Sequence, residues 1–189
     1  MTTAKSEVLR ISNARLAFPQ LFQPKSFNGQ GQDYFSASFI LEKDDAQTSK
    51  LEAVITQLAK EQWKEKADVT LKALRAQDKV ALHDGDLKAN FEGFAGNLYI
   101  NASNKTRPLS VDAQCNPLAE SDGKPYAGCY VNAHIQFWVQ DNQYGKRINA
   151  SLCGVQFVRD GDAFGGAARV SSLEDFEDVS QGSALAELA

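Results

Sequence analysis

The strongest constraint on how this chain can fold is a two-residue alternation in its last third. Between Val131 and Val139 every second residue is apolar, and the residues between them are polar or amphipathic. Successive side chains of a β-strand point to opposite faces, so this period predicts a strand with one buried face. The pattern resumes after the turn sequence DNQYG, and the segment Tyr126–Phe157 therefore predicts two long strands joined as a hairpin.

The second strand of this hairpin changes phase near Gly154. Apolar residues recur at even positions from Ile148 to Leu152 and at odd positions from Val155 to Phe157. A glycine at such a slip indicates a β-bulge, which bends a strand and lets a sheet curl.

The upstream part of the chain predicts further strands and a helix. The ranges with strand periodicity are Val8–Phe18, Tyr34–Leu41 and Asn97–Ser103. Helical spacing of apolar residues predicts a helix over Asp44–Lys66, which Asp44, Asp45 or Thr48 could cap, and a short helix over Leu71–Ala76. The ranges with turn-forming residues are expected to be irregular: Pro19–Gln32, His83–Asp86 and Thr106–Gly123. The predicted fold class is therefore mainly β with one inserted helix, as a curled antiparallel barrel.

Charge is divided unevenly along the chain. No Lys or Arg follows Arg169, whereas five of the 24 acidic residues do, which leaves 20 bases and 19 acids in residues 1–170. The end of the chain combines Gly, Ala and Ser with acids, a composition typical of disorder. We predict a globular domain over residues 1–160 and a flexible acidic tail over 161–189. The acidic run at its centre is expected to bind partner proteins: Glu174, Asp175, Phe176, Glu177 and Asp178.

The chain offers little sign of catalysis, of a cofactor or of a membrane. Its apolar runs are far shorter than the roughly 20 residues of a membrane span, and its N-terminus lacks a secretory apolar core. Cys115, Cys129 and Cys153 are odd in number and form no CxxC pair, which favours free thiols in a reducing cytoplasm. No phosphate-loop, nucleophile-elbow or zinc-protease motif is present. We therefore expect no enzyme, no cofactor and no metal.

Aromatic rings and bases on the polar strand faces favour single-stranded nucleic acid as a ligand. Bases stack on flat rings, and phosphates bind Lys and Arg. The candidate stacking residues are Tyr34, Tyr99, Tyr130, Trp138 and Tyr144. The candidate phosphate contacts are Lys105, Arg107, Lys146 and Arg147. Trp138 could equally be a core residue, because large aromatic side chains are mostly buried.

Several segments resemble a family of bacteriophage and prophage proteins associated with single-stranded-DNA binding. The segments that carry the resemblance are NASNKTRPLSVDA, PYAGCYVNAHI, NQYGKRINASLCGVQFVRDGDAFGG and the acidic run LEDFED. The resemblance implies an OB-type barrel like that of phage helix-destabilising proteins. It also implies a protein that coats single-stranded DNA during replication, recombination or repair in the bacterial host cytoplasm. Replication or recombination proteins would be partners of the tail, and a homodimer is left open.

Two alternatives of other classes remain at this point. The first is a phage structural or assembly protein with a β-sandwich fold and no DNA binding. The second is a metal-dependent enzyme or nuclease accessory that works through His83, Asp84 and Asp86. An Asp-Gly pair is more typical of a turn, and one cluster of three side chains lacks the fuller spacing of metal sites.

Overall fold

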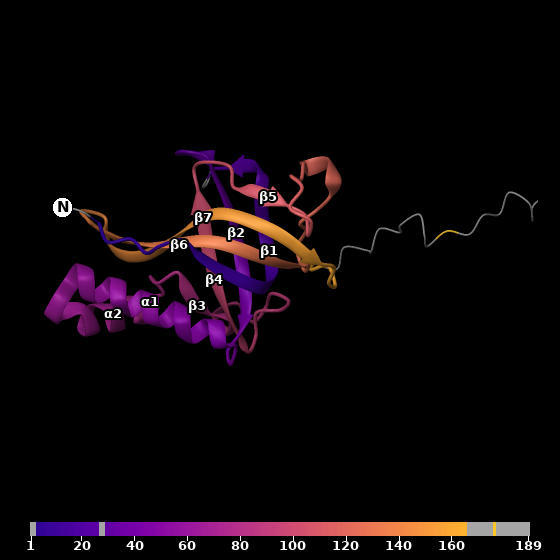
Figure 1. The fold of residues 1–189 in the computed structure, drawn as a ribbon. Coiled ribbons are helices and arrows are strands. Elements are labelled where there is room, and N and C mark those ends of the chain that lie inside the picture. Colours follow the sequence, from indigo (N-terminus) through magenta and orange to yellow (C-terminus); the bar gives the residue numbers. More distant parts are fainter. Residues whose placement is uncertain (1–2, 27–28, 166–175, 177–189) are drawn as a thin grey trace, which may run out of the picture.

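The computed structural model describes residues 3–26, 29–165 and 176, and its organising feature is a curved antiparallel sheet (Figure 1). The strands of the described part are β1 (Leu9–Lys25), β2 (Tyr34–Glu42), β3 (Leu82–Asp84), β4 (Asn97–Asn104), β5 (Leu109–Val111), β6 (Tyr130–Asn142) and β7 (Gly145–Arg159). The α-helices are α1 (Ala46–Trp63) and α2 (Ala67–Ala76). Neither helix has the length and apolar character needed to cross a bilayer.

The sheet closes into a barrel around a single main core. β1 pairs antiparallel with both β2 and β6, β2 pairs with β4, and β6 pairs with β7. The ring closes where β4 meets β7 in parallel at Ser103 and Ser151, and where Val80 bridges to Ile148. The predicted fold class, a mainly β barrel of OB type with a helical insertion, is confirmed.

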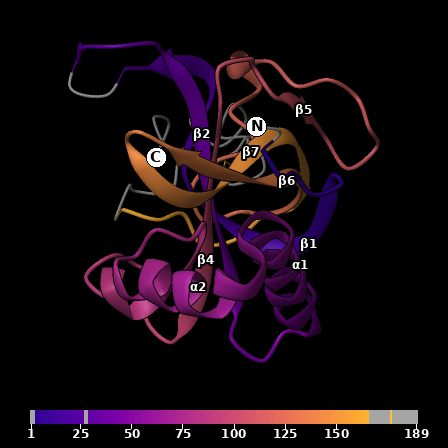
Figure 2. The same cartoon turned by 90° about the vertical axis from the view of Figure 1, so that its left-hand side faces the viewer.

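The hairpin of β6 and β7 follows the predicted alternation closely. Ile135 pairs with Leu152, whereas the preceding residue, His134, pairs with Gly154. Cys153 is thus the extra residue of a β-bulge, at the phase change seen in the sequence. The inward side chains of β6 are buried, among them Ile135 and Phe137 at 0% exposure. Figures 1 and 2 show β6 and β7 as two adjacent, curved strands that cross the barrel.

β1 is longer than the sequence predicts, because it continues to Lys25 through a stretch expected to be a loop. Pro19 and Pro24 are tolerated there because both lie where the register between β1 and β2 shifts. Two short strands were also expected to be irregular: β3 covers part of the predicted turn at His83–Asp86, and β5 lies within the predicted Thr106–Gly123 loop.

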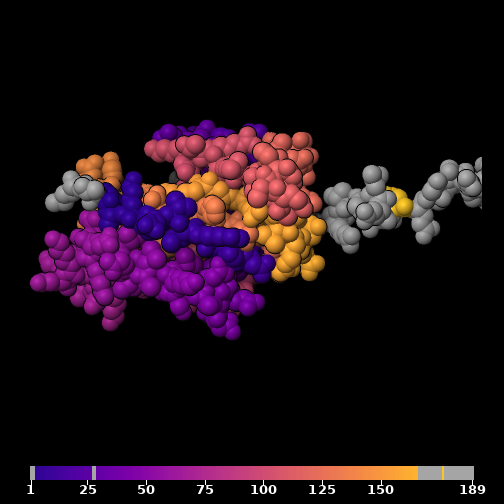
Figure 3. Space-filling view, viewed as in Figure 1, coloured from indigo at the N-terminus to yellow at the C-terminus, as the bar shows by residue number. Residues whose placement is uncertain are grey.

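The inserted helices cover one side of the barrel, which is the lower layer in Figures 1 and 3. Asp45 is the N-cap of α1, and its carboxylate accepts a hydrogen bond from the Gln47 backbone N–H at 2.9 Å. Among the predicted apolar positions, Leu51, Ile55 and Leu58 are buried. Trp63 ends the helix against the hairpin, where its Nε1–H donates to Asp141 at 2.8 Å.

Residues just after the predicted domain boundary at 160 lie against the barrel. The Arg15 guanidinium donates to the Asp162 carbonyl at 2.8 Å and lies 4.3 Å from the centre of the Phe164 ring. The Phe164 N–H donates to the Ala127 carbonyl at 3.0 Å. The four predicted acids of the tail run lie outside the described residues. Phe176, which lies between them in the sequence, is described and exposed.

We predict that Gly128→Ala destabilises the fold more than Gly145→Ala does. Both glycines have positive φ, +103° and +115°, so either alanine brings backbone strain on the order of 1–3 kcal/mol. Only at Gly128 would the new Cβ also lie 2.1 Å from the Asp162 carbonyl oxygen, whereas nothing lies within 4 Å at Gly145. Chemical denaturation gives the free energy of unfolding for each variant. Equal losses would show that residues 160–165 do not pack on the barrel as described.

Candidate nucleic-acid interface

A groove of about 620 Å³ lies between the β2–β4 pair and the β6–β7 hairpin. Its β2–β4 side carries small polar residues that are cross-strand partners: Ser38 pairs with Asn101, and Ser36 with Ser103. The Ser38 hydroxyl donates to the Asn101 side-chain oxygen at 2.5 Å. Short side chains here leave room for a flat ligand to approach the sheet.

The hairpin brings a ring and a cation to the same groove. Trp138 pairs with Asn149, and Gln140 pairs with Arg147, so all four side chains belong to one face and line the groove. Trp138 is partly buried, which places it neither in the core nor fully in solvent. The alternative that Trp138 is a core residue is therefore wrong.

Lys146 and Arg147, both candidate phosphate contacts, lie on opposite faces of the hairpin. Lys146 has the opposite parity and pairs with Asp141 on the helix side of the hairpin. Its ammonium lies 5.7 Å from the centre of the Trp63 ring. Of the two, only Arg147 lines the groove, because adjacent residues of a strand face opposite sides.

Tyr34 and Tyr99 both line the groove, but only Tyr34 offers an accessible ring. Tyr34 is half-buried, whereas Tyr99 is 2% exposed. The Tyr99 ring stacks on His83 at 4.9 Å and meets Phe94 edge-on at 5.0 Å. Burial, with the nearby Asp78 carboxylate, raises the pKa of Tyr99 to about 12. The expectation of an open Tyr99 ring is therefore corrected.

The remaining predicted contact residues lie outside the groove lining. The Tyr130 ring lies beneath Arg159, whose guanidinium carbon is 3.6 Å from the ring centre. Arg107 lies 5.1 Å from the centre of the Phe22 ring. Tyr144 is 83% exposed in the β6–β7 turn, and Lys105 is exposed just after β4.

One aromatic residue and one cation of the groove were missed from the sequence. Phe18 and Lys88 both line the groove, and the Lys88 ammonium lies 4.9 Å from the centre of the Tyr99 ring and 5.6 Å from that of Phe18. Lys88 ends a short 3₁₀ helix after the Asp-Gly turn, and a single lysine there carries no sequence signal. The groove cation is thus supplied by the 3₁₀ helix that begins within the HDGD segment and ends at Lys88.

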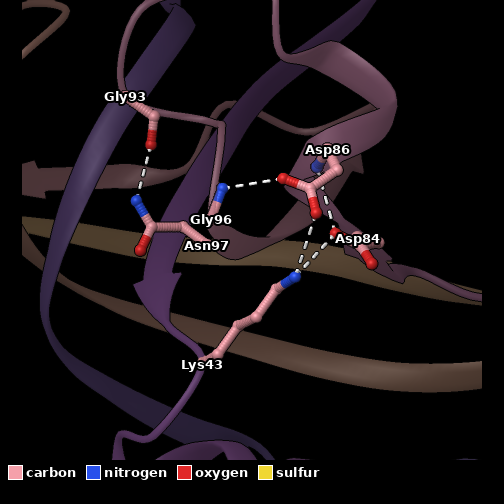
Figure 4. Close-up of polar contacts among 6 residues, drawn as sticks. All are labelled: Lys43, Asp84, Asp86, Gly93, Gly96 and Asn97. Atoms are coloured by element: carbon pink, nitrogen blue, oxygen red, sulfur yellow. Dashed lines mark hydrogen bonds and ion pairs between the residues drawn. The ribbon is translucent and has the colours of Figure 1, made fainter.

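His83, Asp84 and Asp86, the residues of the metal alternative, bind other partners. Asp84 and Asp86 both contact the Lys43 ammonium, at 3.2 and 3.3 Å (Figure 4). His83 pairs with Asp78. In residues 3–26, 29–165 and 176, no three His, Cys, Asp or Glu side chains converge as metal ligands would.

The contacts of Lys43 clamp the loop that follows β3. Asp86 also accepts a hydrogen bond from the Gly96 N–H at 2.8 Å, and Asn97 donates to the Gly93 carbonyl at 2.8 Å. The Gly96 N–H and then Lys43 lower the pKa of Asp86, and the two carboxylates raise the pKa of Lys43. Since the folded-state pKa of Asp86 is depressed, its stabilising contribution is present above the usual value of 3.8 and is lost as pH falls through the lowered pKa.

Comparison with known proteins defines the class: the fold is that of phage single-stranded-DNA-binding proteins. A model of the family described as the Enterobacter phage Enc34 ssDNA-binding protein matches residues 7–185. The chain therefore belongs to this family, and the resemblance seen in the sequence is confirmed.

Individual relatives agree with this membership. "Putative protein p50" of Acyrthosiphon pisum secondary endosymbiont phage 1 is 43% identical over 175 residues, which cover 91% of this chain and 94% of that protein. The bacteriophage Enc34 single-stranded-DNA-binding protein, solved in complex with ssDNA, is 26% identical with a TM-score of 0.67, covering 82% of this chain and 88% of that chain. The gp2.5 protein of bacteriophage T7, a single-stranded-DNA-binding protein, shares the fold at 13% identity and a TM-score of 0.55, covering 91% of this chain and 98% of that chain.

We predict that Lys43→Met raises the pKa of Asp86 toward 3.8 without reaching it, because the Gly96 N–H is the larger cause of its depression. The Gly96 amide resonance, followed by NMR as pH is lowered, reports the midpoint of the Asp86 titration, because the Gly96 N–H donates to that carboxylate. Asp112 is the control, since its pKa is lowered by the Asn116 backbone N–H and not by Lys43. The contact between Lys43 and Asp86 would be contradicted if the midpoint seen at Gly96 did not change. It would also be contradicted if the Asn116 amide, which reports on Asp112, showed an equal change.

Proposed function

We propose that this chain binds single-stranded DNA in the groove between β2–β4 and the β6–β7 hairpin. Trp138 and Tyr34 stack on bases, and Arg147 and Lys88 neutralise phosphates. The observation that carries the proposal is the convergence of these rings and cations on one open groove over a small polar floor. Membership of the family, and the DNA-bound structure of its Enc34 member, support it.

The proposed role is non-catalytic coating of single strands. Stacking on a ring contributes about 1–3 kcal/mol per base and tolerates any sequence, because every base has a flat face. A protein that binds only the single-stranded state shifts hairpins toward that state. Coating of this kind would serve replication, recombination or repair in the cytoplasm of the bacterial host.

The predicted residues outside the groove have more peripheral roles in this proposal. Lys105, Arg107 and Tyr144 are exposed and would contact the strand where it leaves the groove. The acidic run Glu174–Asp178 is proposed to bind replication or recombination proteins, and the chain to act as a monomer or a homodimer.

We predict that Arg147→Gln weakens binding to oligothymidylate, whereas Lys146→Gln does not. The two variants lose the same charge from neighbouring residues, but only Arg147 lines the groove. Loss of one phosphate contact should also reduce the slope of log affinity against log salt by about 0.7. Fluorescence anisotropy at several salt concentrations measures both quantities. Equal weakening by the two variants would indicate attraction by overall charge and contradict the groove.

We predict that oligothymidylate quenches the fluorescence of Trp138 in a Trp63→Phe variant. The chain has two tryptophans, so this variant isolates the indole in the groove from the one packed at the end of α1. Trp138→Phe is the matched control, in which the remaining Trp63 should respond little. Quenching confined to Trp63 would place the ligand on the helical side and overturn the proposed site.

A further inference from the structure

Two phenylalanines stand exposed beside each other, and one of them, Phe18, lines the groove. Phe18 is 46% exposed and Phe91 is 44% exposed, although each is large and apolar. Their rings meet edge-on with centres 5.2 Å apart, and Phe91 also lies 6.3 Å from buried Phe94. A contiguous exposed apolar patch of this kind indicates a binding surface.

The backbone of β1 turns Phe18 outward. Ala17 pairs with Ser38 and Gln20 with Ser36, so β1 carries one residue more than β2 over this stretch. Phe18 lies in the resulting bulge with φ +48°, a left-handed conformation that is rare for a bulky residue. Bulges re-aim side chains next to functional sites, and strained residues persist where the surroundings hold them.

Phe91 is held opposite Phe18 by the clamped loop. Its N–H donates to the Lys88 carbonyl at 2.9 Å, and the Lys43 clamp fixes the loop on both sides, through Asp86 and Gly96. Figure 4 shows Lys43 reaching both Asp84 and Asp86 at the start of this loop. The ring therefore stands on an anchored segment although its surface faces solvent.

The patch is continuous with the groove and carries a cation. Phe18 and Lys88 both line the groove, and the Lys88 ammonium lies 5.6 Å from the Phe18 ring centre. Aromatic faces beside a cation suit a base and its phosphate. A purely apolar partner, by contrast, would have to bury the Lys88 charge at a cost.

We propose that Phe18, Phe91 and Lys88 form a second stacking subsite, which takes a nucleobase of a DNA strand after that strand leaves the groove. This inference rests on the proposed function, since the strand must first occupy the groove. A short oligonucleotide fills the groove without reaching Phe91. Longer strands would therefore gain an additional contact at this subsite.

The test is the affinity of Phe91→Ala and Phe18→Asn for oligothymidylates of increasing length. Asn tolerates left-handed backbone, so Phe18→Asn removes the ring and keeps the bulge. The reference ligand is the shortest oligonucleotide that saturates the quenching of Trp138. Phe91→Ala should bind this ligand as the wild type does, because Phe91 does not line the groove. Each variant should bind long ligands about 5- to 150-fold more weakly, the loss of one stacked base.

The control is Val69→Ala, which truncates an apolar side chain on α2 that is 76% exposed and should leave affinity at every length unchanged. If both Phe variants bound long strands with wild-type affinity, the subsite would be overturned. If Arg147→Gln weakened binding in the same assay, the proposed groove would still be supported. Equal weakening by Phe91→Ala at all lengths would also overturn a separate subsite. Failure of the wild type to bind any length would refute the groove itself.

Discussion

The register between β6 and β7 is the constraint on which the rest of the structure depends. Val139 is the cross-strand partner of Ile148, and both side chains are buried in the core. The adjacent pair, Trp138 and Asn149, must therefore lie on the opposite face of the hairpin. A slip of one residue would exchange the two faces along the whole strand. Burial of apolar side chains thus determines which rings and cations reach the groove.

The elements set by local periodicity could be predicted from the sequence, and those set by tertiary pairing could not. The hairpin, the bulge beside Gly154 and a capping residue among Asp44, Asp45 and Thr48 follow from patterns a few residues long. The extension of β1 to Lys25 runs through Pro19, a signal for a loop. It forms because β2 supplies a partner whose register shifts accommodate the prolines, and no local pattern contains that information.

The site was predictable where alternation is regular and not where the backbone departs from it. Trp138 and Arg147 lie in regular pairs and reach the groove. Phe18 shares the parity of buried Leu16, so alternation assigns it to the core, and a left-handed bulge turns it out. Tyr99 has the parity of an open ring, but His83 from β3 and Phe94 from the loop before β4 cover it. Such cases depend on contacts between segments rather than on spacing within one.

The short terminal strands of the sheet bear on how copies of this protein behave when crowded. β5 has three residues, and the loop after it already occupies its outer side, since the Leu118 N–H donates to the Ser110 carbonyl at 2.8 Å. β3 is equally short and leads directly from the segment that bridges to β7. Few backbone groups are therefore left to template another chain. Neighbours packed at high local concentration would have little opportunity to fuse their sheets into an aggregate.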